Sequence, residues 1–379
     1  MTLFYVSAAR IPSRAANSIH VMKMCQAFAE NNIQTYLVAA KKSDETEKNI
    51  ANVFDYYGVK QNFKLLHIPW LSIRGYAGIY SMLVFLHYTK VCIINRSIPV
   101  CFGRFPLGLY VLRVYRPKMA LEVHAPIPKK GIQSFLMKGI IRDKNFKFLV
   151  VISDALKQII LADFPELEDK IVVSHDGADV VDIDIQLALP DKKTNTFHCG
   201  YIGHLYQGRG IETLLTIAKN IPELHMHLVG GLPGDIEYWK QQSKLIPNIT
   251  IHGFLPPSKT AAFRNSMDML IAPYESRVSV YKSSMDTSKW MSPLKIFEYM
   301  SAKKPIFCSD IAVLREVLRD NDNAILCDPD DSHDWIVKIK SSMKNPELLA
   351  RIQEKAYQDF ITHYTWNQRA KKISEKLLL

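Results

Sequence analysis

The sequence predicts an α/β protein with two doubly wound parallel sheets in tandem. Short β-rich runs alternate with segments whose apolar residues recur at helical spacing, as in "TLFYVSA", "IHVMKMCQAFAENN" and "IQTYLVAA" near the N-terminus. Such alternation is typical of a parallel sheet that helices cover on both faces. The series is interrupted once by a polar stretch and then begins again, and 379 residues are enough for two domains.

The first half of the chain contains the strands of an expected N-terminal domain, residues 1–185. After the first two strands, further strands are expected at "KVCIIN", "MALEVHA" and "FKFLVVIS". The breaker-rich stretch "ARIPSRAANS" is expected to be the loop between the first strand and the first helix. Loops of this kind follow the carboxyl ends of strands, where open α/β sheets bind their ligands.

The second half predicts a C-terminal domain over residues 197–360. The polar stretch before it loses periodicity, and we expect its residues 186–196 to form the linker. Six short β-like runs follow, "FHCGYIG", "HMHLVGG", "NITIHGF", "DMLIAPY", "KPIFCS" and "NAILCD", with helical segments between most of them. Residues 361–379 are expected to form a terminal helix that packs back on the N-terminal domain.

Composition points to an ordinary globular protein of the cytoplasm. The six cysteines form no CxxC pair and have no histidine at ligand spacing, so neither a disulfide framework nor a zinc site is expected. The N-terminus has no basic region leading into a long apolar one, and no run approaches the 18 apolar residues of a spanning helix. We therefore expect a protein that is soluble or lies on a membrane surface.

Positive charge is concentrated in one stretch. Residues 96–147 contain eleven Lys and Arg against Glu122 and Asp143, in a chain of net charge +11. Such a stretch can bind nucleic acid, anionic lipid or a phosphorylated substrate. No helix-turn-helix, RRM or zinc pattern accompanies it, so no nucleic-acid partner is expected, and a non-enzymatic nucleic-acid-binding protein that uses this stretch is kept only as an alternative.

Part of this basic stretch has helical apolar spacing. The segment "KKGIQSFLMKGIIRDKNFK" predicts an interfacial helix on an anionic membrane, at the inner face of the plasma membrane. An ordinary amphipathic core helix is the alternative. The apolar positions concerned are Ile132, Phe135, Leu136, Ile140 and Ile141.

Two glycine-rich turns and one helix start are the candidate ligand-binding segments. In "YIGHLYQGRGIETLL", Gly203 ends a strand and two further glycines flank Arg209, a pattern that lets the backbone and a guanidinium approach a phosphate. "VGGLPGD" supplies Gly230 and Gly231 in a second such turn. A plain βα turn with a surface arginine remains the alternative for the first.

The segment "MSPLKIFEYMSAKKPIF" predicts a helix that starts with Ser292 as N-cap and Pro293 at the first position. The i, i+3 spacing of Lys295 and Glu298 places both side chains on one helix face. This pattern indicates either a binding site or a surface ion pair.

Taken in order, "YIGHLYQGRGIETL", "VGGLPGDIEYW", "ITIHGFLPPSKTAAFRNSMDMLIAPYES" and "SPLKIFEYMSAKKPIFCSD" resemble the family-four glycosyltransferases of the GT-B fold, of the bacterial polysaccharide type. The N-terminal half resembles them through "IHVMKMCQAFAE", "EVHAP" and "VVISDALKQII". The resemblance implies two Rossmann-like domains facing a cleft. It also implies a nucleotide-sugar donor, UDP favoured over GDP, and retaining transfer to a hydroxyl of a glycan or lipid-diphosphate acceptor in cell-surface polysaccharide assembly. No metal and no other cofactor is expected.

The resemblance also assigns roles to individual residues. Glu298 is expected to hold the donor ribose, since a carboxylate accepts two hydrogen bonds from a vicinal diol. Arg209, Lys295 and His124 form the expected catalytic group, the first two on the diphosphate and His124 on the transferred sugar. Other expected donor contacts are Gly203, His204, Gly230, Gly231, Phe254, Leu255, Ser292 and Leu294, and the first loop adds Arg14, Asn17 and Ser18 as acceptor or phosphate contacts.

The sequence departs from the family pattern at two positions. Trp290 stands where the first glutamate of the E-x7-E motif is expected, and Glu275 or Asp286 could replace that carboxylate from a long polar loop. Pro293 stands where a glycine amide often meets the phosphates, and proline has no N–H. The amides of Leu294 and Lys295 are therefore the expected phosphate donors.

Two other enzyme classes remain as alternatives. A metal-dependent glycosyltransferase of the other major fold needs a D-x-D, and Asp182 and Asp184 form one, although they fall near the expected linker. A sugar-nucleotide epimerase of the GT-B fold works on the free donor and has no need of a basic N-terminal face.

Overall fold

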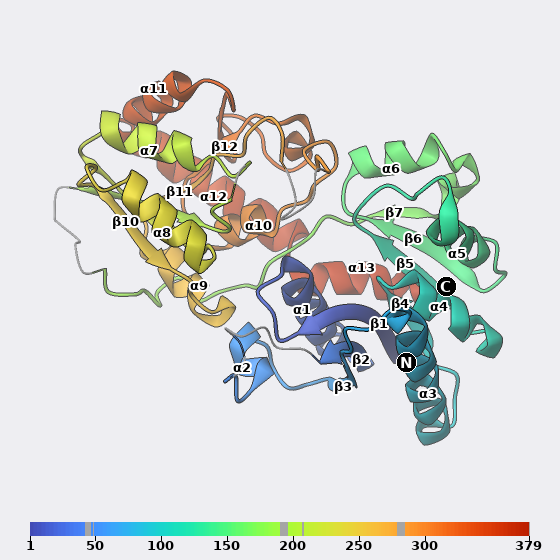
Figure 1. Cartoon of the computed structure of the whole chain (residues 1–379). Helices are drawn as coiled ribbons and strands as arrows, with labels where there is room; N and C mark the ends of the chain where they lie inside the picture. The colour runs from blue at the N-terminus through green and yellow to red at the C-terminus, as the bar shows by residue number, and fades with distance from the viewer. Residues whose placement is uncertain (42–46, 48, 190–195, 207, 279–284, 379) are drawn as a thin grey trace. The chain divides into compact units, whose positions relative to one another are not determined.

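The computed structural model describes residues 1–379 except 42–46, 48, 190–195, 207, 279–284 and 379. It divides into two compact units, which we call the N-terminal unit (Met1–Asp176 with Trp366–Leu379) and the C-terminal unit (Gly177–Thr365). Each unit is a Rossmann-like α/β domain built on one parallel sheet (Figure 1). The predicted fold class is confirmed.

The N-terminal unit has a seven-stranded sheet in the order β3-β2-β1-β4-β5-β6-β7. The order reverses between β1 and β4, and such switch points are where open parallel sheets bind ligands. The terminal helix α13 belongs to this unit and packs against α1. Its elements are β1 (Thr2–Ile11), α1 (Ala16–Glu30), β2 (Gln34–Lys41), α2 (Val53–Tyr57), β3 (Lys64–Pro69), α3 (Tyr76–Asn95), β4 (Val100–Gly103), α4 (Pro106–Leu112), η2 (Arg113–Tyr115), β5 (Met119–Val123), α5 (Gly131–Ile141), β6 (Phe146–Val151), α6 (Asp154–Leu161), η3 (Pro165–Lys170), β7 (Ile171–Val173) and α13 (Trp366–Leu378).

The C-terminal unit has a six-stranded sheet in the order β10-β9-β8-β11-β12-β13, with its switch point between β8 and β11. All six strands predicted for this half are present. Its elements are β8 (Phe197–Ile202), α7 (Ile211–Asn220), β9 (Leu224–Val229), α8 (Pro233–Gln242), β10 (Ile249–Gly253), α9 (Pro257–Asn265), β11 (Met269–Ala272), α10 (Leu294–Ser301), β12 (Ile306–Ser309), η4 (Ala312–Glu316), β13 (Ile325–Cys327), α11 (Ser332–Met343) and α12 (Pro346–His363).

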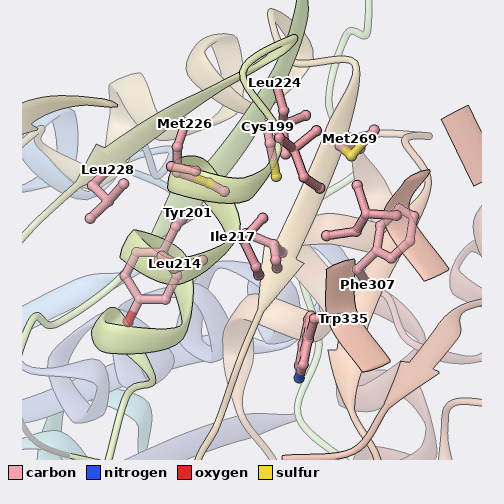
Figure 2. Close-up of a cluster of buried hydrophobic side chains, with 14 of the residues drawn as sticks. Cys199, Tyr201, Leu214, Ile217, Leu224, Met226, Leu228, Met269, Phe307 and Trp335 are labelled. Atoms are coloured by element: carbon pink, nitrogen blue, oxygen red, sulfur yellow. The ribbon is translucent and has the colours of Figure 1, made fainter. Parts of the chain in front are cut away.

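Side-chain alternation along β8 and β9 sorts the two faces of the C-terminal sheet. Cys199 and Tyr201 of β8 point into the same buried cluster as Leu214 of α7 and Trp335 of α11 (Figure 2). Because successive residues of a strand point to opposite faces, the alternate position His198 lies on the other face. The helices α7 and α11 therefore cover an apolar face, and the opposite face carries polar rings.

The division between the units falls at Asp176/Gly177, earlier than the expected end of the N-terminal domain at residue 185. The amide of Asn265, at the end of α9, donates to the carbonyls of Asp182 and Ile185. The Leu187 N–H donates to the hydroxyl of Ser266. These hydrogen bonds fasten the segment to the C-terminal unit, which the polar composition of the segment does not indicate. Most of the expected linker 186–196 lies outside the described residues.

One predicted strand of the N-terminal half is wrong. "KVCIIN", residues 90–95, is the last part of helix α3, and the next strand, which pairs with β1 on the side away from β2, is β4. An apolar run of six residues fits either a buried strand or a buried helix, so periodicity alone does not decide between them. The sequence reading also omitted β3, β4 and β7.

The expectation that no segment is long and apolar enough to span a membrane is also wrong. In the part of the chain that the structure describes, α3 alone, with 20 residues, is long and apolar enough to span a membrane by length and composition. In the fold it lies alongside the sheet, where Tyr80, Val84 and Tyr88 are buried. The Tyr80 and Tyr88 hydroxyls donate to the carbonyls of Ser7 and Pro99. The helix is thus a covering layer of the sheet with one face buried.

Candidate functional site

The loops at the switch point of the C-terminal sheet bring together most of the predicted donor-binding residues. Gly203, His204 and Arg209 follow β8, and the helix α10 begins between β11 and β12. The backbones pack tightly here. A Cβ atom on Gly230 would lie 2.0 Å from the Gly203 carbonyl oxygen, and one on Gly231 would lie 2.8 Å from the Leu205 side chain. Glycine is therefore required at positions 230 and 231 of the second turn for packing, whatever ligand the turn meets.

The Lys295 amine lies at the Gly203 turn. A Cβ atom on Gly203 would lie 2.8 Å from Lys295 Nζ, which is 4.0 Å from the ring centroid of Tyr201 and 5.0 Å from that of Tyr274. Cation–π contacts of this length stabilise the charged form. Burial and the nearby Arg209 guanidinium nevertheless hold the pKa of Lys295 well below its ordinary value. An anion bound here would raise it again.

Arg209 lies over aromatic rings. Its guanidinium donates to the Tyr206 hydroxyl at 2.8 Å and lies 5.0 Å and 5.8 Å from the ring centroids of Tyr206 and Tyr274. His204 was expected as a second cation, but burial, Arg209 and Lys295 lower the pKa of His204 to about 4. The imidazole is neutral at pH 7, because burial and the neighbouring Arg209 and Lys295 disfavour a further positive charge.

The helix α10 starts one residue later than predicted. Pro293 is its N-cap in extended conformation, and its carbonyl accepts the Ile296 N–H at 3.1 Å. Ser292 is buried and precedes the N-cap residue, so it is not the N-cap that the sequence predicted. The first helical residues are then Leu294 and Lys295, whose amides have no acceptor within the helix. The expectation for these two amides fits the observed start of the helix.

Glu298 and Lys295 form no ion pair among the described residues, although they share a helix face. Glu298 Oε2 instead lies 3.5 Å from the Arg264 guanidinium of α9. Arg264 is buried and also donates to the Thr260 hydroxyl at 3.1 Å. The pair leaves the Glu298 side chain 26% exposed, so this carboxylate can still meet a ligand. The sequence analysis missed Arg264, which lies with Phe263 and Asn265 on the buried side of α9.

The two candidate replacements for the missing glutamate differ in their contacts. The Glu275 carboxylate accepts the Gly208 N–H at 3.0 Å and the Gly210 N–H at 3.4 Å, so it lies on the glycine-rich turn. Asp286 accepts the N–H groups of Val278 and Ser288 and closes its own loop. Trp290 is buried. The structure therefore favours Glu275, while residues 279–284 of the same loop lie outside the described residues.

Four histidines line the face of the C-terminal sheet that α9 covers. His198 Nδ1 lies 2.8 Å from His227 Nε2, and His227 Nδ1 lies 2.9 Å from His252 Nε2, which forms a hydrogen-bonded chain across β8, β9 and β10. His225 stacks on His227 with ring centroids 4.6 Å apart. The predicted base-reading residues Phe254 and Leu255, both half-buried, follow at the end of β10.

In the N-terminal unit, His124 belongs to a buried network of charged groups. Its Nε2–H donates to Glu122 Oε1 at 2.5 Å, which leaves Nδ1 as the acceptor atom of the ring. Burial and Arg104 lower the pKa of His124 to about 4, so the ring is neutral at pH 7. Burial acts to raise the pKa of Glu122, but Arg369 and His20 outweigh it and hold that pKa well below its usual range. Glu122 is therefore an ionised acceptor that fixes the His124 tautomer.

The same network reaches three further elements. His20 of α1 lies 2.9 Å from Glu122 and, through its other nitrogen, 3.0 Å from Asp176. Arg369 of α13 lies 3.2 Å from Glu122 Oε2. Donor atoms of His20, Glu122, His124 and Asp176 lie within 4.8 Å of one another, a spacing that could hold a metal ion. The buried Arg369 already balances the charge of the Glu122 carboxylate.

The three predicted ligand contacts of the first loop differ in how exposed their side chains are. The Ser18 hydroxyl is buried and donates to the carbonyls of Ser13 and Ala15. Arg14 pairs with Glu47 at 2.6 Å, and Asn17 is exposed. Ser18 therefore stabilises the loop and is not accessible to a ligand, because its buried hydroxyl is hydrogen-bonded to the loop backbone. In the C-terminal unit, the exposed Asp182 and Asp184 form a turn of their own and belong to none of the metal-capable groups among the described residues.

Comparison with known proteins gives a family match within the C-terminal unit. Residues 184–359 match the family described as Glycosyl transferases group 1. The matched residues include both glycine-rich turns, Arg209, Lys295 and Glu298.

Proteins similar in sequence or structure include other glycosyltransferases. Over 240 residues, 59% of this chain, the sequence is 23% identical to an uncharacterized glycosyltransferase of Methanocaldococcus jannaschii, and the match spans 58% of that protein's length. A glycosyltransferase from Rickettsia africae is similar in structure, with a TM-score of 0.72 and 16% identity over 99% of this chain and 97% of that one. Anabaena HepE, solved in complex with UDP and glucose, is also similar in structure. Its TM-score is 0.67, with 16% sequence identity over 100% of this chain and 99% of that one. At these identities the structural likeness establishes the GT-B fold.

Proposed function

We propose that the protein is a retaining glycosyltransferase. The donor is a nucleoside-diphosphate sugar, UDP-linked in preference to GDP-linked, and the acceptor is a hydroxyl group of a glycan or lipid diphosphate in cell-surface polysaccharide assembly. The observation that supports this best is the cationic turn of the C-terminal unit. There the Lys295 amine, the Arg209 guanidinium and the first amides of α10 gather near the strand-end Gly203.

The arrangement suits a diphosphate followed by a ribose. Two side-chain cations and the N-terminus of a helix attract the phosphate oxygens. Glu298 lies one helical turn beyond Lys295, and its carboxylate can accept two hydrogen bonds from the ribose diol. The buried Arg264 beside it keeps that carboxylate oriented. UDP complexes of Anabaena HepE, a structural neighbour, agree with this choice of donor.

In the proposed reaction the bond between the sugar C1 and the diphosphate oxygen breaks, and a bond from the acceptor oxygen to C1 forms on the same face of the sugar. The acceptor proton passes to the leaving diphosphate. Negative charge on the diphosphate is greatest in the transition state, so Arg209 and Lys295 stabilise that state more than the ground state. These cations supply the charge that a metal ion provides in other transferases, and the proposal needs no metal.

The neutral His124 is assigned to the transferred sugar. With Nε2–H committed to Glu122, Nδ1 can accept a hydrogen bond from a sugar hydroxyl. Glu275 is assigned to the sugar side of the donor in place of the missing glutamate, because its carboxylate lies on the turn that carries Arg209.

The test is a panel of UDP- and GDP-sugars incubated with the protein and lipid-diphosphate or oligosaccharide acceptors, with EDTA present. We expect release of UDP from one sugar nucleotide, dependent on acceptor, and a product whose anomeric configuration matches the donor by NMR. The Arg209→Ala variant is expected to lower kcat on the order of a hundredfold or more and to change KM less.

Two results would contradict the proposal. Inversion of the anomeric centre would exclude the retaining reaction. A change in the configuration of the free sugar nucleotide in the absence of any acceptor would identify a sugar-nucleotide epimerase instead.

A further inference from the structure

The outward face of α3 is mostly apolar. Residues on this face recur at intervals of three or four, as expected for one side of a helix. Four of the five outward positions are large apolar side chains, and the fifth is a lysine. The positions are Ile79 (43% exposed), Met82 (64%), Leu86 (51%), Lys90 (exposed) and Ile93 (70%).

Packing within the unit explains only the inner face of the helix. Tyr80, Val84, Tyr88 and Val91 are buried. A helix of a globular protein that packs one face on a sheet normally carries polar residues on the other. Folding therefore gives no reason for the outward stripe, and exposed apolar surface of this kind marks an interaction site.

Aromatic contacts continue this face from α3 toward α5. Phe85 of α3 lies 5.2 Å from Tyr115 of η2, measured between ring centroids. Tyr110 of α4 lies 6.0 Å from Phe135 of α5. In the chain of contacts α3 packs beside α4, and α4 packs beside α5 (Figure 1). The exposed side chains Val114 (77%), Ile132 (71%) and Phe135 (60%) extend the apolar surface over these elements.

The structure divides the apolar stripe that the sequence predicted for α5. Leu136, Ile140 and Ile141 are buried and belong to the core, whereas Ile132 and Phe135 are exposed. The core reading of α5 is therefore confirmed for Leu136, Ile140 and Ile141, whereas the membrane reading stays a prediction for Ile132 and Phe135. The sequence analysis does not predict the apolar face of α3, because it predicts a strand over residues 90–95, which are the last six residues of this helix.

The charge around this face has one sign. Residues 70–142 contain eleven Lys and Arg and a single acidic residue, Glu122, which is buried. Two of the cations are already paired, Arg113 with Asp143 and Lys129 with Asp163. Exposed cations of the stretch include Lys90, Arg96, Arg116, Lys118, Lys130 and Lys138.

We propose that this face, defined by the exposed apolar residues of α3, η2 and α5, docks on the surface of a bilayer rich in anionic phospholipid. Apolar side chains would enter the interfacial region while the surrounding Lys and Arg meet the lipid phosphates. A second copy of the chain is disfavoured as the occupant, since pairing two such faces would bring like charges together. The protein is then peripheral to a membrane, whatever sugar it transfers.

The experiment is co-sedimentation of the full-length protein with vesicles of phosphatidylcholine alone or with phosphatidylglycerol. We expect binding to the mixed vesicles at low salt, weakened by added salt because surface charges are screened over a Debye length of about 8 Å at physiological ionic strength. Binding to phosphatidylcholine alone should be at least tenfold weaker.

Two variants test whether the exposed apolar side chains of α3 contribute to vesicle binding in addition to the charged residues. Leu86→Ser with Ile93→Ser removes two exposed side chains and is expected to weaken binding at least tenfold without changing circular dichroism. Leu245→Ser, which removes a 93% exposed leucine from the C-terminal unit, is the matched control and should bind like the parent. Equal binding of the double variant and the parent, or no binding at low salt, would overturn the proposal. So would a concentration-dependent dimer that the double variant abolishes. None of these outcomes depends on glycosyl transfer, so this proposal and the proposed function fail separately.

Discussion

The chain of histidines on the C-terminal sheet makes that unit sensitive to acid. His227 is fully buried, with ring nitrogens 2.8 Å and 2.9 Å from those of His198 and His252. Burial, followed by the neighbouring His225, His252 and His198, lowers the pKa of His227 from 6.5 to about 3. The native ring is therefore neutral at pH 5, whereas the same ring in the unfolded chain is protonated.

The sign and size of the effect follow from this difference. Because the unfolded state binds the extra proton, stability falls as the pH drops below about 6.5 and continues to fall toward pH 3. With pKa values of about 3 and 6.5, His227 alone is expected to remove about 2 kcal/mol from the free energy of unfolding between pH 7 and pH 5.

Urea unfolding at pH 7 and pH 5, followed by tryptophan fluorescence, measures how much His227 contributes to the pH dependence of the free energy of unfolding. Trp239 and Trp335 both report on the core of the C-terminal unit. The parent contains other acid-sensitive groups, so the comparison is with His227→Gln, which cannot gain a proton. The variant is expected to lose about 2 kcal/mol less than the parent over this pH range. Equal losses in the two proteins would show that His227 is not held neutral in the native state.

Three further predictions concern the turns and the two sites. Binding of UDP should raise the pKa of Lys295, because the diphosphate favours the charged amine, and calorimetry over a range of pH in buffers of different ionisation enthalpy should show proton uptake that Lys295→Met reduces. Gly230→Ala should prevent folding or lower Tm sharply, because its Cβ would lie 2.0 Å from a carbonyl oxygen, whereas Gly234→Ala, with no atom within 4 Å, should be neutral or stabilising by up to about 1 kcal/mol. Glu122→Gln should lower kcat and move its pH profile while donor affinity stays unchanged, and an unaltered profile would contradict its positioning role.

The sequence predicted the C-terminal unit better than the N-terminal one. Its strands are short β-rich runs separated by glycine and proline, so periodicity and turn residues agree. The N-terminal half contains α3, whose apolar residues cover both faces and hide the helical period. The three-residue strand β7 is too short to show any period.

The candidate site was predicted in part, for a physical reason. Residues on a single helix or turn, such as Lys295 and Glu298, could be placed because helical spacing fixes their relation. Arg264 and Glu275 could not be placed, because each reaches its partner through tertiary contacts with another segment. Likewise the sequence marks His124 but not the link from Glu122 to Arg369, which are 247 positions apart.

Direct measurement of UDP binding tests the donor site most sharply. UDP at one hundred times its Kd should add about 2.7 kcal/mol to the stability of the parent protein. Glu298→Ala should weaken UDP binding by roughly ten- to a hundredfold, since a hydrogen bond to a charged group contributes about 1.5–3 kcal/mol. Glu347→Ala, which removes an exposed glutamate from α12, should bind UDP like the parent. If Glu298→Ala binds UDP as tightly as the parent and the Glu347→Ala control do, the donor is not held by α10 and the account of this site is wrong.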